Sequence, residues 1–345
     1  MLDMPSLFVV FEPKTAWERA HSALSKSGYG RFLVDDESIT TILDEVSKGG
    51  IPVKEWPLPE QPFTELFEAI RVTPRPLVWN LTDGYEVYLG SNIPAFVQLA
   101  RVPHVATGTY AQILCQNKHH LKAVAQSIGI PVAVGVCVSS RTISQSSIPK
   151  TLCGPYFVKP ARLGNSIGDD LINPVCPDAE AALEAASCLI NANISEVLIE
   201  ELLPGKEFSI VALNGGEWHM ECAHIKYEKS YFDSAAKDGG NFTLEFSTGP
   251  EAAQMITLTK RLAEAIYLRD YFRVDFRCNS RGQPRLLEVN THPYLVSKAF
   301  NKMADIHFGS RSNMLKSMIM QSYERQMSPQ SKNSIGRTLT LKSKN

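Results

Sequence analysis

Three side chains with oxygen donors share one short stretch of the sequence. Asp275 lies in an extended run, and Glu288 and Asn290 lie in a second run that follows a turn. Alternate side chains of a strand point to the same face, so pairing the two runs would bring all three oxygens together. Such donors on rigid strands suit a hard cation such as Mg²⁺, which also binds phosphate oxygens. The alternative interpretation is a charged strand face that meets solvent.

The stretch that positions these donors, residues 271–293, is predicted to be an antiparallel hairpin. Residues 271–277 and 285–290 form its strands, and a turn containing Gly282 joins them. The opposite face is predicted to be apolar, with Phe272, Val274, Phe276, Leu287 and Val289.

A second group of residues suits a phosphate. A predicted strand in residues 155–160 carries Lys159, and a small-residue loop with Asn165 and Ser166 follows at residues 164–168. Glycines let backbone N–H groups approach an anion, and lysine and serine could complete the cradle. This is not the P-loop pattern, because no Gly-Lys-Ser/Thr opens a following helix, and an ordinary turn with a surface lysine is the alternative.

Residues 196–203 are predicted to form a strand that ends at Pro204 and Gly205. A strand edge that turns away leaves main-chain groups unpaired, as recognition of an adenine ring requires. Glu200 and Glu207 would flank the base and the ribose. The long polar stretch 229–249, with Lys237 at its centre, is typical of a lid or of a disordered loop.

The first third of the chain alternates apolar runs with helical patterns, which predicts βαβ units and a mostly parallel sheet. Such sheets bind ligands at the carboxyl ends of their strands, where Glu18, Asn80 and Asp83 are candidate substrate contacts. The predicted strands are residues 6–11, 31–34, 51–56 and 76–81, and the helices are 15–27, 41–48 and 63–70.

Farther along, residues 110–128 are predicted to form one helix that carries Lys118 and two surface histidines, His119 and His120. The histidines have no second pair at metal-ligand spacing. A strand is expected at residues 131–139, a hairpin at 208–226, and further helices at 179–191, 251–268 and 310–327.

Composition indicates a globular protein with two or three domains. The chain has 345 residues, 44% of them hydrophobic, and a net charge of −1, so no global field favours nucleic acid or a membrane surface. Seven scattered cysteines without a C-x-x-C pair indicate a reduced, cytoplasmic protein without a zinc site. Neither a signal peptide nor a transmembrane run of about 18 apolar residues is apparent.

Four segments occur in the order typical of the ATP-grasp fold and resemble the D-alanine:D-alanine ligase group: FVKPARLGNSIG, VLIEELLPGKEF, FRVDF and LLEVNTHP. The resemblance implies an α/β (α+β ATP-grasp) architecture. A Rossmann-like domain (1–112) would be followed by a central (113–203) and a C-terminal (204–327) ATP-grasp subdomain that clamp ATP between them. Residues 328–345 would be a disordered basic tail.

The resemblance also implies a role for each matching residue. Lys118 and Lys159 would hold the ATP phosphates, Arg273 would stabilise charge on the acyl group, and Glu18 would receive the amino group of the first substrate. Two Mg²⁺ ions, with Mn²⁺ as a substitute, would bind Asp275, Glu288 and Asn290. The remaining matches are Asn165 and Ser166 in a glycine-rich flap, Lys237 in the lid, Glu200, Leu202 and Leu203 beside the adenine, and Glu207 on the ribose.

The chemistry implied is attack of a carboxylate on ATP, formation of an acyl phosphate, and its displacement by an amine. Departures lie on the acceptor side. Tyr294 stands where the group has glycine, Ala299 stands near a carboxylate-binding serine that Lys298 could replace, and Asp238 replaces an aromatic residue of the lid.

We therefore hypothesise a carboxylate–amine ligase of small molecules whose amine substrate is not D-alanine. The alternatives are an authentic D-alanine:D-alanine ligase and a non-catalytic, ATP-binding regulatory protein. The resemblance further suggests a homodimer formed through the first domain.

Overall fold

The computed structural model describes residues 4–20, 34–58, 63–82, 90–143, 148–162, 171–227 and 241–328. Its first sheet is parallel, as predicted, and its strand order is β2-β1-β3-β4. The strands are β1 (Ser6–Phe11), β2 (Val53–Pro57), β3 (Pro76–Asn80) and β4 (His104–Val105), and the helices among them are α1 (Lys14–Ala20), α3 (Asp36–Lys48), α4 (Phe63–Val72) and α5 (Asn92–Leu99). The predicted strand 31–34 and the second half of the predicted helix 15–27 fall largely outside the described residues.

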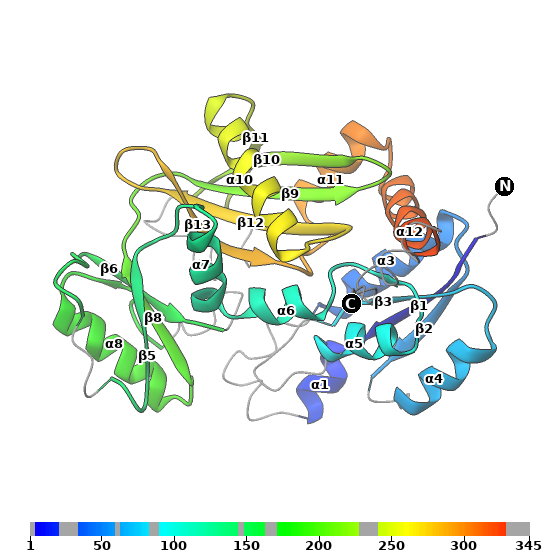
Figure 1. Ribbon diagram of the computed structural model, residues 1–345, viewed down its shortest axis with the longest axis horizontal. Helices are drawn as coiled ribbons and strands as arrows, with labels where there is room; N and C mark the ends of the chain where they lie inside the picture. Colours follow the sequence, from blue (N-terminus) through cyan, green and yellow to red (C-terminus); the bar gives the residue numbers. More distant parts are fainter. Residues whose placement is uncertain are drawn as a thin grey trace, which may run out of the picture.

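The second sheet is antiparallel, in the order β5-β8-β6-β7, and α8 packs on it (Figure 1). Its elements are β5 (Gly135–Ser139), β6 (Tyr156–Pro160), β7 (Val175–Cys176), α8 (Ala179–Asn191) and β8 (Glu196–Glu201). The strand predicted at residues 131–139 begins only at Gly135. The segment before it contacts a different sheet instead, since Pro131 accepts a hydrogen bond from the backbone N–H of Leu286 at 2.8 Å.

The third sheet, in the order β11-β10-β9-β12-β13, contains the predicted hairpin. Its elements are β9 (Glu207–Asn214), β10 (Trp218–Lys226), β11 (Thr243–Phe246), β12 (Tyr271–Cys278) and β13 (Pro284–Asn290), with α10 (Pro250–Ile266) packed on one face. Strand β11 lies within the stretch 229–249 that was expected to be a lid or loop, so that prediction was wrong for its last residues.

The apolar face of the hairpin is confirmed with one correction. Phe272, Val274 and Phe276 are fully buried in the core. In the partner strand Leu286, rather than Leu287, joins Val289 there. The register shifts between Asp275 and Phe276, so a β-bulge at this point breaks the alternation on which the prediction depended.

The helix predicted over residues 110–128 is two helices, α6 (Thr109–Gln116) and α7 (Lys118–Ser127). Asn117 separates them because its backbone is extended (φ −104°, ψ 103°). Its side chain caps α7 by accepting hydrogen bonds from the backbone N–H groups of His119 (3.0 Å) and His120 (3.1 Å). The break places Lys118 at the start of a helix, not in its middle.

The C-terminal helices α11 (Lys298–His307) and α12 (Arg311–Met327) return to the first sheet. One apolar cluster unites Leu7 and Trp79 of that sheet with Phe300 and Met318 of these helices. In Figure 1, α12 lies beside α3. The first and last segments of the chain therefore share a core.

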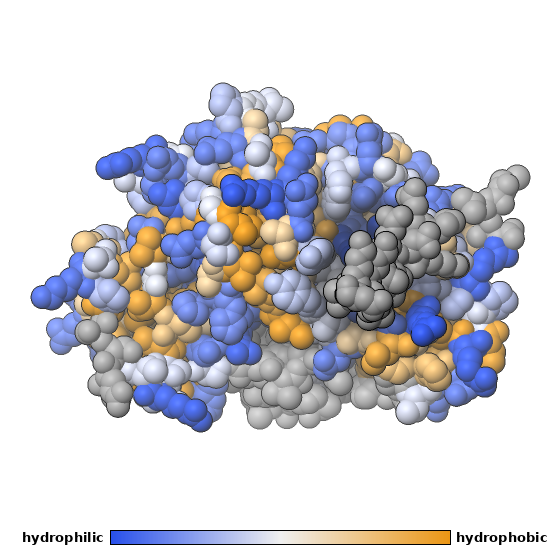
Figure 2. Space-filling view, viewed as in Figure 1, coloured by the Kyte–Doolittle hydropathy of each residue, from blue (hydrophilic) through white to orange (hydrophobic). Residues whose placement is uncertain are grey.

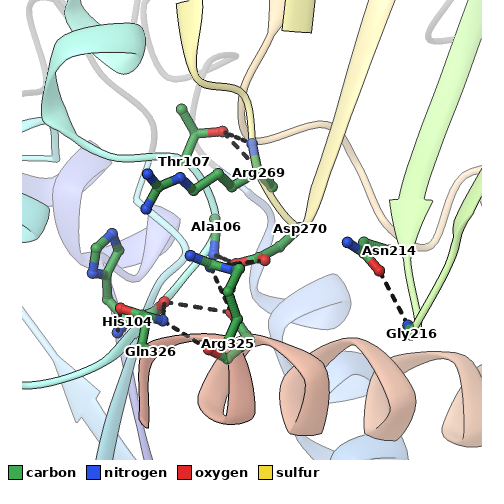
Figure 3. A network of polar contacts seen from close by, with 10 residues as sticks. His104, Ala106, Thr107, Asn214, Gly216, Arg269, Asp270, Arg325 and Gln326 are labelled. Carbon is green, nitrogen blue, oxygen red and sulfur yellow. Dashed lines mark hydrogen bonds and ion pairs between the residues drawn. The ribbon is translucent and has the colours of Figure 1, made fainter. Parts of the chain in front are cut away.

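A polar network closes this junction (Figure 3). The buried carboxylate of Asp270 accepts hydrogen bonds from the backbone N–H of Ala106 (2.8 Å) and from Ser322 (2.5 Å), and pairs with Arg325 at 3.0 Å. Nearby, Gln326 donates to the backbone carbonyl of His104 at 2.7 Å. Asp270 thus joins the start of β12 to both the first sheet and α12.

The surface mixes polar and apolar side chains on the face seen in Figure 2. Exposed apolar residues include Val72 at the end of α4 and Leu99 at the end of α5, which are 73% and 85% exposed. Among the residues that the structure describes, none of the helices has the length and apolar character that crossing a membrane requires.

Candidate active site

A buried carboxylate with two lysines lies between α7 and the second sheet. Glu200 on β8 is 3% exposed, and its Oε2 lies 2.9 Å from the Nζ of Lys159 on β6. Its other oxygen pairs with Lys122 of α7. Burial alone would raise the pKa of Glu200, but the two ammonium groups lower it to about 2. Glu200 is therefore an anion that holds two cations in place.

Lys122 and Lys118 lie one helical turn apart on α7 and reach different sheets. Burial lowers the pKa of Lys122 to about 8, even though Glu200 favours the charged form. Lys118 is 8% exposed as a residue, and its Nζ lies 3.3 Å from Oε2 of Glu288 on β13. Helix α7 thus carries positive charge to both the second and the third sheet.

On the hairpin, Arg273 and Asp275 form a two-pronged ion pair. Nη2 of Arg273 lies 2.8 Å from Oδ2 of Asp275, and its Nε donates to Oδ1 at 2.9 Å. Ser209 of β9 and the side-chain amide of Asn290 also donate to this carboxylate, at 2.5 and 3.2 Å. Asp275 lies directly opposite Glu288 in the hairpin. The hairpin register and the hydrogen bond from Asn290 thus place Asp275, Glu288 and Asn290 beside one another, while their role as metal ligands stays a prediction.

These donors suit a hard cation only in part. Two carboxylates and one amide offer oxygens of the type that Mg²⁺ prefers. Within the described residues no group of three or more His, Cys, Asp or Glu side chains is placed to hold a metal ion, and this trio is not of that type because its third member, Asn290, is an amide. Three donors leave positions for further oxygens, such as those of a phosphate, to complete the coordination.

Two backbone N–H groups at the end of β8 are already hydrogen-bonded. The backbone N–H of Glu201 donates to the carbonyl of Val134, and that of Leu202 donates to Pro155, both at 2.9 Å. These two amides are therefore paired rather than open to a base. Leu203 is 4% exposed. Glu207, at the start of β9, accepts a hydrogen bond from Tyr227 at 2.7 Å and lies 3.7 Å from Arg277.

Of the candidates near the first sheet, Asn80 is the last residue of β3 and Glu18 lies on α1. Glu18 is half-buried on α1, after Trp17, which packs in the core of the second sheet. Asn80 is used by its own loop: it accepts from the backbone N–H of Thr82 at 3.1 Å and donates to the carbonyl of Gly90 at 2.9 Å. Asn80 therefore bonds to Thr82 and Gly90, at the two ends of this connection, whereas Glu18 stays a candidate substrate contact.

Several predicted site residues fall outside the part of the chain that the structure describes. These are Lys237, Asp238, Asn165, Ser166 and Asp83, together with nearly all of the expected basic tail.

The residues that depart from the family pattern have definite places. Tyr294 is 41% exposed, and its hydroxyl donates to Asp35, the N-cap of α3, at 2.6 Å. The Nζ of Lys298 lies 4.5 Å from the ring centre of Phe242, so it makes a cation–π contact. Ala299 is 5% exposed within the shared core.

Sequence reasoning missed Lys122, Ser209 and Tyr227. The spacing of Lys122 from Lys118, four residues on one helix, was a usable signal, because side chains at this spacing share a face. Ser209 and Tyr227 carry no comparable pattern, and only the folded sheet brings them to Asp275 and Glu207.

Comparison with known proteins shows which family this chain matches. Residues 124–320 match the family described as D-ala D-ala ligase C-terminus. A D-alanine–D-alanine ligase of Haemophilus influenzae is 29% identical over 203 residues, 57% of this chain and 66% of that protein, or just under two thirds of its length. One of Neisseria meningitidis is 27% identical over 266 residues, 76% of this chain and 83% of that protein.

Solved structures agree at the level of the fold. The D-alanine–D-alanine ligase of Bacillus anthracis complexed with ATP covers 93% of this chain and 98% of its own, with a TM-score of 0.68 and 17% identity. A D-Ala:D-Ser ligase of Enterococcus faecalis covers 93% of this chain and 100% of its own, with a TM-score of 0.63 and 18% identity. The predicted ATP-grasp fold is thereby confirmed.

Proposed function

Because the chain belongs to the D-alanine–D-alanine ligase family, we propose that it is an ATP-dependent ligase that joins the carboxylate of one amino acid to the amine of another. The observation that carries this proposal is the set of charged pairs where α7 and the two antiparallel sheets meet: Lys159 with Glu200, Lys118 with Glu288, and Arg273 with Asp275. Lysines are suited to phosphate, and arginine to an oxyanion.

In this proposal the buried cations bind the nucleotide. Lys159, held by Glu200, and Lys118 would bind the ATP phosphates as point charges. Asp275, Glu288 and Asn290 would hold Mg²⁺ together with phosphate oxygens, and the bound ion would neutralise charge on the transferred phosphoryl group. Glu200, Leu202, Leu203 and Glu207 would border the base and ribose. We further propose two ions, replaceable by Mn²⁺, which counting bound Mn²⁺ in the presence of ATP would test.

The reaction would then run in two steps. The first carboxylate attacks the terminal phosphorus of ATP, which gives an acyl phosphate and ADP. The amine of the second substrate attacks the acyl carbon, and phosphate leaves with its electron pair as the amide forms. Arg273 would stabilise the oxyanion of this step, Glu18 would bind the first amino group, and Ser166 and Lys237 would act from the flap and lid.

We propose that the amine substrate is not D-alanine. Support comes from the exit of the hairpin, where this chain has Tyr294 at the position for which the resemblance implies a glycine, and where Lys298 makes a cation–π contact with Phe242. We therefore expect an amine substrate that fits in less space, or one that carries a different polar group.

The test is ADP release by the full chain with ATP and Mg²⁺ across D- and L-amino acids, singly and in pairs, with mass detection of the amide. One pair other than D-alanine with itself should give a product. Efficient D-alanyl-D-alanine synthesis would contradict the altered acceptor, and tight ATP binding without any turnover would favour a regulatory protein. Glu288→Gln should reduce turnover by at least about 100-fold, since it removes one proposed ligand of the Mg²⁺ ion that assists phosphoryl transfer. Glu264→Gln, on the exposed side of α10, is the matched control.

Assembly and location are also proposals. The apolar side chains of Val72 and Leu99 are exposed on the first domain and would support a homodimer there, which light scattering would detect. Each of the seven cysteines is a free thiol, as expected for a protein of the cytoplasm.

A further inference from the structure

The exit of the hairpin is tied to the first domain by one tyrosine hydroxyl. Tyr294 donates to Oδ2 of Asp35 at 2.6 Å and also contacts the hydroxyl of Ser38. Its neighbour Leu295 is buried at 2% exposure, whereas the Tyr294 side chain is 41% exposed. The backbone here is therefore anchored, and the phenol reaches away from it to the other domain.

The acceptor of this hydrogen bond is the N-cap of α3. Asp35 accepts the backbone N–H of Ser38 at 2.8 Å, as an N-cap residue does. Burial would raise the pKa of Asp35, but the hydrogen bonds from Tyr294 and Ser38 outweigh it and lower that pKa. The carboxylate is thus an anion at neutral pH that also faces the positive end of the helix.

The next residue of α3 holds the helix that carries Glu18. Oδ1 of Asp36 accepts the backbone N–H of Lys14 at 2.8 Å, and Oδ2 accepts the hydroxyl of Thr15 at 2.7 Å. Both donors lie in the first turn of α1. Glu18 follows Thr15 by three residues, a spacing that places two side chains on the same side of a helix.

Asp35 and Asp36, at the N-terminus of α3, therefore connect two distant parts of the site. On one side is the chain that leaves Asn290 of the hairpin, four residues before Tyr294, and on the other is α1. Trp17 fixes α1 from its other side, because it is 8% exposed in the core of the second sheet. A displacement of the α3 N-terminus would therefore tilt Glu18 relative to the hairpin.

We propose that Tyr294 is a positioning residue that, through Asp35 and Asp36, sets the place of Glu18 and so the binding of the first amino acid. The proposal rests on the proposed function only for the role of Glu18. It assigns the unusual tyrosine a purpose on the first-substrate side, in addition to the space that it occupies.

The test compares Tyr294→Phe with Tyr110→Phe, which removes the hydroxyl of a tyrosine that is 57% exposed and lies at the start of α6. Amide hydrogen exchange of the full chain reads the connection without any turnover. In Tyr294→Phe the N–H groups of Lys14 and Thr15 should exchange about tenfold faster, because loss of a hydrogen bond to a charged group loosens what it holds. Tyr110→Phe should leave them unchanged.

The kinetic readout separates positioning from a general loss of structure. In Tyr294→Phe the KM of the first amino acid should rise about tenfold, whereas the KM of ATP should change less than about twofold. Asp35→Asn, which keeps a good N-cap, should give a smaller shift in the same direction. Unchanged exchange at Lys14 and Thr15 would overturn the proposal. If no amino acid supports turnover in the unmodified chain, the proposed function fails, and the exchange result alone still decides the connection.

Discussion

At the scale of single residues, the charge on Glu200 decides how two lysines are held. Its pKa in the folded protein, about 2, lies below the usual value for a glutamate. A depressed carboxylate pKa stabilises the fold above the unfolded-state pKa, and this contribution is lost as pH falls through the folded value. We expect thermal stability to fall between about pH 4.5 and pH 2, and Glu200→Gln to flatten this part of a Tm-against-pH curve. A curve of unchanged shape would contradict the assignment.

Lys122→Met tests how much Lys122, which was not predicted from the sequence, contributes to the stability of the fold. Removing one partner of a buried ion pair costs about 3–5 kcal/mol, and the remaining contact of Glu200 with Lys159 places the loss near the lower end. Urea unfolding measures this loss. The double variant Lys122→Met with Glu200→Gln should recover part of it, because the buried anion is then gone. The exposed change Lys48→Met is the control, since that lysine pairs with Glu45 at the surface.

The candidate residues differed in how far local pattern could predict them. Asp275, Glu288 and Asn290 were predictable because strand alternation is a local property, and it holds on the side of the bulge where Asp275 pairs with Glu288 and Arg273 pairs with Asn290. The partners of these side chains were not, since Ser209 and Lys118 come from elements far away in sequence. The local pattern thus predicted the oxygen-donor side chains of the site, whereas their contacts with Ser209 and Lys118 depend on tertiary packing.

Among the secondary-structure elements, the break at Asn117 decides where Lys118 starts its helix. Asn117→Ala should remove the cap of α7 and the hydrogen bond to Glu196 at 3.1 Å, which together contribute about 1–2 kcal/mol. Asn117→Ser keeps a capping oxygen and should lose roughly half as much. Denaturant unfolding of both variants provides the measurement, and equal losses would mean that capping is not the cause.

Elements were predictable where one periodicity ran without interruption. Helix α10 was found because its apolar spacing is regular, and β1, β2 and β3 of the first sheet were found because each is a short apolar run. The division of α6 from α7 and the bulge after Asp275 escaped, because each depends on a single residue whose backbone conformation departs from the pattern around it. Strand β11 escaped because its pairing partner β10 lies across a long connection.

For the whole molecule, Asp270 is the residue that joins the first domain to the last helix. Asp270→Asn removes a buried charge that Ser322 and Arg325 contact by hydrogen bonds and should cost about 1–3 kcal/mol. Glu324→Gln changes an exposed residue of the same helix and should stay within about 0.5 kcal/mol. Thermal unfolding of the two variants is the comparison. Equal stability would show that the apolar contacts of α12 alone hold the junction.

The shared core of the first sheet and α12 has a consequence for the time course of synthesis. Leu7 and Trp79 leave the ribosome long before Met318, with which they share one buried cluster. At about 5–20 residues per second, the roughly 240 residues between Trp79 and Met318 take some 12 to 48 s to be made. During that interval the newborn first domain presents apolar surface that no part of the chain can yet cover, so chaperone capture of nascent chains should be greatest there and should end when α12 emerges.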